Sequence, residues 1–162
     1  MLDGANWYLR SHPVKAYGAG GRKAHQHGVG DCWNHFIVTY WYPGDVKVDF
    51  SSAEFTKGYR DLCVRILGSA GTADSHYGGA VNIHGDNAWA GTEKDDTHSG
   101  AIANVKNFVD SIRTGKYLNN VAESVESNLT AILGRTAAYL GRPVTWDEVL
   151  KSTEKYEAKL TF

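Results

Sequence analysis

Side chains that could bind a metal or move a proton are concentrated in one short stretch, "HQHGVGDCWNH". Its candidates are His25, His27, Asp31, Cys32 and His35. Imidazole, thiolate and carboxylate groups are all zinc ligands, and a His-x-His pair on a strand would direct both rings to one face. The spacing matches no standard zinc module, however, and Gly28-Val29-Gly30 indicates a loop between two strands. We therefore predict no metal site.

Two interpretations of this stretch remain open. It can be a loop with exposed histidines, in which Cys32 is simply a small buried residue. Alternatively, His35 has a functional role, because it falls in a strand-like run whose alternation could direct it into a cleft. A structural histidine with satisfied hydrogen bonds is the competing explanation for His35.

A second stretch, "YGAGGRK" from Tyr17 to Lys23, resembles a phosphate-binding loop only in part. A dinucleotide-binding loop needs a third glycine and a helix directly after it, so that backbone amides face the pyrophosphate. Lys23 stands at that glycine position, and loop residues follow it. We predict no nucleotide binding here. Arg22 could hold an anionic or hydroxylated ligand, or could be a solvated surface arginine.

Composition narrows the possible classes of protein. The chain has 162 residues, of which 42% are hydrophobic, so we predict a single domain over residues 1–162. A net charge of -1 gives no electrostatic reason to expect nucleic acid or an anionic membrane as partner. No apolar run approaches the roughly 20 residues that a bilayer span needs. Two cysteines are too few for a disulfide scaffold, and we expect a reducing cytoplasm.

Strands are predicted to form the first half of the chain. Between residues 14 and 83, runs of β-branched and aromatic residues are separated by turn sequences such as Pro43-Gly44-Asp45. Apolar and polar residues alternate in "VKVDFSS", which is typical of an antiparallel strand with one buried face. The strands carry so many large aromatic residues that the second sheet face should contact a partner subunit, a ligand or another domain.

Helices are predicted to follow the strands. We interpret residues 85–100 as a polar surface loop, after which apolar spacing predicts helices over residues 101–115 and 121–141. Gly134 inside the second helix indicates close packing against a neighbour. Thr145 and Glu148 have the spacing of a capping box that opens a short helix. This order predicts an α+β fold, an open, mostly antiparallel β-sheet with helices packed on one face.

The first nine residues also have helical spacing. We expect this helix to be frayed at its start, or to dock on the sheet through Leu2, Trp7 and Leu9. Asp3 lies one helical turn in, where a carboxylate is favoured by the helix dipole or could lie near a functional site. No Ser-His-Asp arrangement or nucleophile-elbow sequence can be recognised anywhere in the chain.

Four segments together resemble the carboxy-terminal domain of Gfo/Idh/MocA-type oxidoreductases, the glucose–fructose oxidoreductase and inositol dehydrogenase family. They are "LDGANWYLRSHPVKAYGAGGRK", "GDCWNHFIVTYWYPGDVKVDFSS", "GSAGTADSHYGG" and "SIRTGKYLNNVAESVESNLTAILGRTAAYLGRPVTWDEVLKS". The last is the most specific, because G-K-x-L-N-N, A-E-S, L-T-A-I-L-G-R, A-A-Y and V-T-W-D-E occur in one order.

The resemblance implies a two-domain plan for the parent enzyme. An amino-terminal Rossmann domain binds NAD or NADP, and an α+β domain lines the sugar or polyol site and builds the oligomer. The Rossmann glycine fingerprint, the E-K-P lysine and the N-I-H-x-L-D histidine of the family have no counterpart in residues 1–162. We therefore predict no catalytic residue in this chain. The predicted substrate-binding residues lie in matching segments and are Asp3, Arg22, Trp33 and His35.

The sequence thus predicts a substrate-binding and oligomerisation domain of an NAD(P)-dependent sugar or polyol oxidoreductase. We expect a partial or truncated protein that binds no cofactor and transfers no hydride by itself. Its expected partners are a second copy, bound through the open sheet face, a Rossmann domain in the same protein or a second chain, and a sugar or polyol. A stand-alone sheet-mediated assembly or sugar-binding module is the first alternative. A metal-dependent enzyme built on His25, His27 and His35 is the second.

Overall fold

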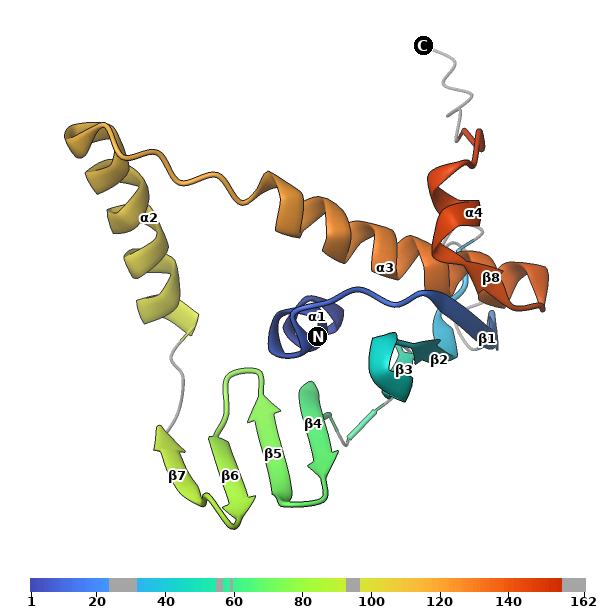
Figure 1. Ribbon diagram of the computed structural model, residues 1–162, viewed down its shortest axis with the longest axis horizontal. Helices are drawn as coiled ribbons and strands as arrows, with labels where there is room; N and C mark the ends of the chain where they lie inside the picture. The colour runs from blue at the N-terminus through green and yellow to red at the C-terminus, as the bar shows by residue number, and fades with distance from the viewer. Residues whose placement is uncertain (24–31, 55–56, 59, 93–96, 156–162) are drawn as a thin grey trace. The chain divides into compact units, whose positions relative to one another are not determined.

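The computed structural model of the chain describes residues 1–23, 32–54, 57–58, 60–92 and 97–155 (Figure 1). These residues form two compact units, each with its own four-stranded antiparallel sheet. The first unit contains Met1, Asp3–Tyr8 and residues 57–125, and the second contains Leu2 together with residues 9–54 and 126–155. Within these ranges no helix is both long and apolar enough to cross a membrane.

Sheet A, in the second unit, has the strand order β3-β2-β1-β8. The strands are β1 (Lys15–Gly21), β2 (His35–Trp41), β3 (Lys47–Ala53) and β8 (Val144–Thr145). The predicted turn between β2 and β3 is confirmed as a single 3-10 turn, η1 (Pro43–Asp45), in which Gly44 has a φ of 71°. A positive φ is readily adopted by glycine, which explains why this residue occupies the tip of the turn.

Helix α3 (Val121–Leu140) covers one face of sheet A with its second half, residues 126–140. The predicted alternation of "VKVDFSS" is confirmed, since Val48 and Phe50 pack against this core while Lys47 and Asp49 are exposed. Leu2 and Leu9 also pack against it, as predicted. The core is made by Ala16, Val38, Tyr40, Tyr42, Leu133, Ala137 and Val144.

The predicted close packing of Gly134 is confirmed in α3. A Cβ atom added to Gly134 would lie 2.7 Å from Cζ of Tyr40 and nearer still to the hydroxyl oxygen. Tyr40 is 1% exposed, so its ring fills the space that a larger residue at 134 would need. This burial, with the neighbouring Tyr42, raises the pKa of Tyr40 far above its ordinary value. The glycine therefore lets the helix approach the sheet closely.

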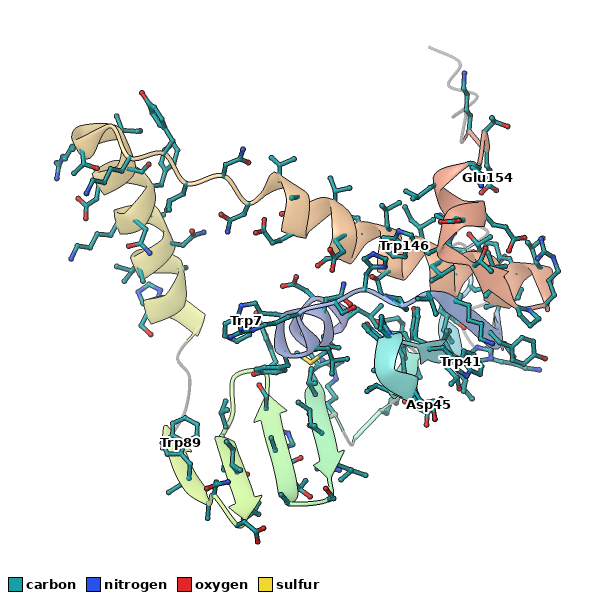
Figure 2. All side chains as sticks on the ribbon, viewed as in Figure 1. Trp7, Trp41, Asp45, Trp89, Trp146 and Glu154 are labelled. Carbon is teal, nitrogen blue, oxygen red and sulfur yellow. The ribbon has the colours of Figure 1, made fainter. Side chains whose placement is uncertain are left out.

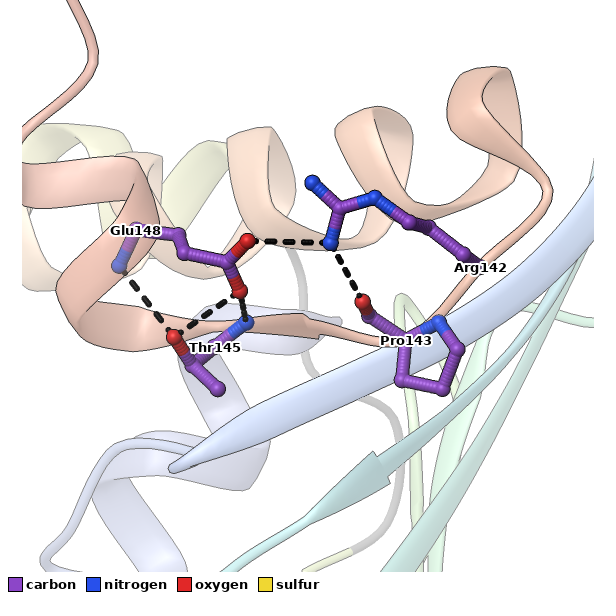
Figure 3. A network of polar contacts seen from close by, with 4 residues as sticks. All are labelled: Arg142, Pro143, Thr145 and Glu148. Carbon is purple, nitrogen blue, oxygen red and sulfur yellow. Dashed lines mark hydrogen bonds and ion pairs between the residues drawn. The ribbon is translucent and has the colours of Figure 1, made fainter.

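The predicted capping box is also confirmed, at the start of α4 (Trp146–Leu150). Figure 3 shows the network: Glu148 accepts hydrogen bonds from the Thr145 backbone N–H and hydroxyl, and the Glu148 backbone N–H donates to Thr145 Oγ1. Arg142 Nη1 adds a 2.9 Å ion pair to Glu148 and donates to the Pro143 carbonyl. These contacts lower the pKa of Glu148, the Thr145 backbone hydrogen bond having the largest effect.

Sheet B, in the first unit, has the strand order β4-β5-β6-β7. The strands are β4 (Cys63–Gly68), β5 (Gly71–His76), β6 (Val81–Gly85) and β7 (Trp89–Thr92). Helix α1 (Leu2–Leu9) lies against one face of this sheet, because Gly4 approaches the Val64 side chain and Tyr8 Oη donates a 3.0 Å hydrogen bond to Ser75 Oγ. The opposite face carries Cys63 and His76, which the register places directly opposite each other.

Two expectations about the first unit are wrong. Trp7 does not dock on a sheet: its exposed fraction is 73%, and Figure 2 shows where it lies on α1. Residues 85–100 are not all loop, because β7 pairs with β6 through an irregular register and α2 (Thr97–Thr114) begins within the stretch. The four residues of β7 include Gly91 with a φ of 76° and are too few to produce an alternating pattern.

The predicted α+β class is confirmed, with open antiparallel sheets and helices. The strands fall into two sheets of four, a partition that the sequence did not indicate. Helix α2 keeps its predicted apolar stripe, yet the stripe is largely exposed to solvent. Its more than half-exposed members are Ile102, Val105, Phe108 and Ile112.

Candidate functional site

Three of the predicted substrate-binding residues, Arg22, Trp33 and His35, lie at the loop end of the β1–β2 hairpin, where residues 22–34 connect the two strands. The register ends with Gly21 opposite His35, so Arg22 directly follows the paired part of β1 and Trp33 lies two residues before that of β2. All three side chains are half-buried. The hairpin therefore brings residues that are more than ten positions apart in the sequence to one end of sheet A.

Asn34 holds this end of the hairpin together. Its backbone N–H donates to the Gly21 carbonyl at 3.0 Å, and its carbonyl accepts from the backbone N–H of Glu54 at 2.9 Å. Its side-chain amide accepts from the Lys23 N–H at 2.9 Å and donates to the Lys23 carbonyl. An aspartate could not make the second of these contacts, because an ionised carboxylate only accepts hydrogen bonds. The amide therefore suits this position structurally.

His35 lies on the face of sheet A that α3 does not cover. Phe36 packs against the core, and successive strand residues point to opposite faces, so the His35 side chain is directed to the open face. A Cβ on Gly21 would lie 3.2 Å from His35 Cε1, which places the imidazole over this glycine. His35 Nδ1 is 3.4 Å from Asn34 Oδ1, a long contact that a proton on Nδ1 would favour.

Trp33 belongs instead to an aromatic cluster on the side of α3. Its ring centroid is 4.5 Å from that of Tyr139 and 5.8 Å from that of Phe36, and Tyr139 lies on α3. Trp33 and His35 are thus directed to opposite sides of the sheet. Aromatic side chains commonly line ligand pockets, and a neutral imidazole can exchange hydrogen bonds with a hydroxyl. The end of the hairpin therefore offers two chemically distinct surfaces.

The fourth predicted residue, Asp3, lies in the first turn of α1, in the other compact unit, and is exposed. The other metal-ligand candidates of the histidine-rich stretch, His25, His27 and Asp31, lie outside the described residues. Cys32, which we expected to be buried if it is structural, is exposed. That expectation is wrong because Cys32 precedes β2 and does not belong to the packed part of the sheet.

The glycines of "YGAGGRK" serve strand pairing. A Cβ on Gly18 would lie 2.8 Å from Val38 Cγ2, and one on Gly20 would overlap the His35 carbonyl oxygen. Both glycines lie within β1, in extended backbone that pairs with β2. Their close approach to β2 accounts for the glycine content without a phosphate ligand. A dinucleotide-binding loop also needs a helix directly after it, and the residues that follow Lys23 lie outside the described part of the chain.

A second group of potentially functional side chains was not predicted. Asp61, Cys63 and His76 converge on sheet B, with His76 Nδ1 2.7 Å from Asp61 Oδ1 and all three ligand atoms within 4.8 Å of one another. Burial, together with a hydrogen bond to Asp61 and its charge, raises the pKa of the Cys63 thiol. The signal was present in the sequence: a tight turn at residues 68–71 sets a register in which Cys63 opposes His76.

Comparison with solved structures finds this fold in several oxidoreductases. Aldose-aldose oxidoreductase from Caulobacter crescentus, complexed with glycerol, is 15% identical with a TM-score of 0.67 over 89% of this chain and 44% of its own. Myo-inositol 2-dehydrogenase from Lactobacillus plantarum is 17% identical with a TM-score of 0.67, over 89% of this chain and 45% of its own. An oxidoreductase from Agrobacterium radiobacter, in complex with NAD+, L-tartaric acid and magnesium, is 14% identical with a TM-score of 0.70. The match covers 90% of this chain and 46% of that oxidoreductase.

No protein-family model and no curated protein matches the sequence. The chain spans less than half the length of the solved oxidoreductases that it resembles. The chain therefore has the fold of part of these oxidoreductases, in agreement with the fold that the sequence resemblance implies. At such low identity the likeness establishes the fold alone, and the roles of Asp3, Arg22, Trp33 and His35 stay predictions.

Proposed function

We propose that this chain is the substrate-binding and assembly domain of an NAD(P)-dependent oxidoreductase that acts on sugars or polyols, and that it transfers no hydride by itself. The observation that carries the proposal is the shared fold, which extends over about nine-tenths of this chain and under half of each solved oxidoreductase. The remaining half, with the cofactor site, belongs to the same protein or to a second chain.

The open face of sheet A supports a role in assembly. Tyr17 and Ile37 lie on it with exposed fractions of 46% and 67%, next to the half-buried Trp41. The Lys15 ammonium group lies 5.0 Å from the centre of the Trp41 ring, a cation–π contact at the margin of this apolar surface. Apolar groups surrounded by polar ones are typical of an interface between proteins. We propose that two copies pair through this face.

The exposed stripe on α2 supports contact with a further domain. An apolar stripe on one helix face ordinarily packs against another element, and that of α2 is more than half exposed at four positions. We propose that a Rossmann domain, in the same protein or in a second chain, covers this stripe. Contact with that domain would complete the active site at which NAD or NADP accepts the hydride.

A hydride-transfer assay tests the first part of the proposal. The purified 162-residue chain is mixed with NAD+ or NADP+ and a panel of sugars and polyols, and the absorbance of the reduced nicotinamide is followed. We expect no rise above the protein-free control. Turnover with any substrate of the panel would show that the chain is itself a complete oxidoreductase, and would contradict the proposal.

Sedimentation velocity tests the assembly role. We expect the chain to be a dimer, and Ile37→Lys to yield monomers because a lysine there would be desolvated at the interface. Leu67→Lys is the matched control, since Leu67 is 78% exposed on sheet B and should leave the dimer intact. A monomeric wild-type chain, or equal effects of the two substitutions, would contradict pairing through sheet A.

Saturation-transfer NMR with myo-inositol and glycerol tests the substrate-binding role. We expect transfer to at least one of these polyols in the wild-type chain and a much weaker signal in Trp33→Ala. Trp7→Ala is the matched control, because it removes an exposed indole that the proposal does not use. Equal signals from both variants would remove Trp33 from the site.

A stand-alone assembly or sugar-binding module remains the second candidate, because the open face of sheet A would serve it equally well. The reading frame upstream of Met1 distinguishes the two. A Rossmann domain encoded there in frame, ending in E-K-P and N-I-H motifs, would support the oxidoreductase, and a chain that binds polyol without such a partner would support the module.

A further inference from the structure

Three side chains that can bind a metal ion lie close together on the face of sheet B that is opposite to α1. Cys63 in β4 and His76 in β5 are directly opposite in the antiparallel register, and Asp61 precedes Cys63 by two residues. In an antiparallel pair, directly opposite residues project to the same face, so the thiol and the imidazole are neighbours. The backbone near them is fixed by hydrogen bonds from Tyr77 N–H to the Leu62 carbonyl and from His76 N–H to the Ala80 carbonyl.

The distances among the three groups are close to those of a metal site. The Asp61 oxygen, the Cys63 sulfur and a His76 nitrogen all lie within 4.8 Å of one another. Zinc bonds of about 2.0–2.3 Å in a tetrahedral site separate the ligand atoms by roughly 3.3–3.8 Å. Side-chain rotations that shift the ligand atoms by about 1 Å or less would therefore bring them to those separations, and the backbone need not move.

We propose that Asp61, Cys63 and His76 bind one zinc ion, with the fourth position taken by water. A thiolate and an imidazole favour zinc over magnesium or calcium, which prefer oxygen ligands. The Asp61 and His76 side chains are 22% and 31% exposed, which gives both the ion and a water access to the group. A bound ion would tie the segment that enters β4 to the end of β5.

Charges on the same sheet face are compatible with a cation. Arg65 is two residues from Cys63 in β4, and Asp74 is two residues from His76 in β5. These two residues are paired in the register and form an ion pair with each other. The guanidinium charge is therefore balanced at close range by the Asp74 carboxylate. Asp61 then provides the negative charge nearest to the ion, which favours a divalent cation over an anionic ligand.

A catalytic cysteine is the competing interpretation of the same group, and the geometry does not favour it. A nucleophilic cysteine needs a thiolate stabilised by a positive neighbour. Here burial and a hydrogen bond with the Asp61 carboxylate raise the pKa of Cys63, and His76 Nδ1 contacts that same carboxylate. Zinc removes this obstacle, because coordination itself deprotonates a thiol.

Cobalt(II) spectroscopy on the chelator-treated 162-residue chain tests the proposal. Added Co²⁺ should produce a thiolate-to-cobalt charge-transfer band that saturates at one ion per chain and is abolished by one equivalent of Zn²⁺. Cys63→Ser should abolish the band. His76→Gln and Asp61→Asn should each lower Zn²⁺ affinity by more than the roughly 10–100-fold that loss of an outer-shell partner causes.

Two matched controls separate this group from other thiols and imidazoles. Cys32→Ser removes the other cysteine, which is exposed, and His84→Gln removes an exposed histidine of β6. Neither should change the band or the affinity. Absence of stoichiometric uptake would overturn the proposal, and so would a band that depends on Cys32 rather than Cys63.

X-ray absorption spectroscopy on the zinc-loaded wild-type chain keeps the test decisive if a variant fails to fold. We expect one sulfur and three nitrogen or oxygen ligands at zinc. A spectrum without a sulfur ligand would overturn the proposal, because Cys63 is the thiol that defines this site. The measurement uses neither substrate nor cofactor, so its outcome is independent of the proposed oxidoreductase function.

Discussion

Gly134→Ala is the substitution whose effect follows most directly from the structure. In an exposed helix, alanine is more favourable than glycine by about 1 kcal/mol. At position 134 the new Cβ would lie 2.7 Å from Tyr40 Cζ, a separation that real Cβ atoms do not show. Inserting a methylene into a packed core costs about 1–3 kcal/mol, and the clash here is with an aromatic ring that is 1% exposed. We expect a net destabilisation of up to about 2 kcal/mol after the helix-propensity gain is subtracted.

Urea denaturation followed by circular dichroism provides the assay, and Gly100→Ala provides the matched control. Gly100 lies in α2, and a Cβ there would meet no heavy atom within 4 Å. That substitution should therefore stabilise the chain by up to about 1 kcal/mol. Tyr40→Phe removes the hydroxyl oxygen nearest to the new methyl group, so Gly134→Ala should be less harmful in that background. Equal stabilisation by the two alanines would refute the packing argument.

Three further perturbations test local features of the same unit. Asn34→Asp should lower the free energy of unfolding by about 1 kcal/mol, because the carboxylate cannot donate to the Lys23 carbonyl; an unchanged urea midpoint would contradict this. The Thr145 hydrogen bonds lower the pKa of Glu148 in the folded state, so its contribution is present above the ordinary pKa and lost as pH falls through the lowered one. The stability gap between wild type and Glu148→Gln should accordingly close below about pH 4, and a gap constant down to pH 3 would be inconsistent with that linkage. Burial raises the pKa of Tyr42 to about 12, so the unfolded state ionises first and stability should fall above about pH 10. Tyr42→Phe should reduce this alkaline loss, as measured by thermal unfolding, and an identical loss in both proteins would assign it to other groups.

Local chemistry explains which parts of the fold could be predicted. The capping box of Thr145 and Glu148 acts within one helical turn, and the spacing of α3 is visible along twenty residues. Gly134 stood out because glycine is unfavourable in a helix unless a neighbour requires it. The partition into two sheets depends on which distant strands pair, and no local pattern encodes that choice. The strand β7 was missed because Gly91 interrupts a segment of only four residues.

The candidate sites show the same limit. Strand alternation assigns His35 to one face of sheet A, but Trp33 precedes β2, so alternation did not assign its ring to the opposite side. Register, by contrast, could have been used: the pairing of Gly68 with Gly71 fixes Cys63 opposite His76. Asp61 lies outside any strand, and only the structure shows that its carboxylate joins them.

The two-residue strand β8 has a consequence for how the chain acquires its fold. It pairs with β1, and Trp146 N–H donates to the Val14 carbonyl, so contacts close over about 130 residues of intervening sequence. During synthesis this edge of sheet A stays unpaired until Val144 and Thr145 have left the ribosome. Folding dominated by such non-local pairs is slow and leaves strand edges open to aggregation. The second unit is thus discontinuous in the chain, because residues 57–125 of the first unit separate its two segments.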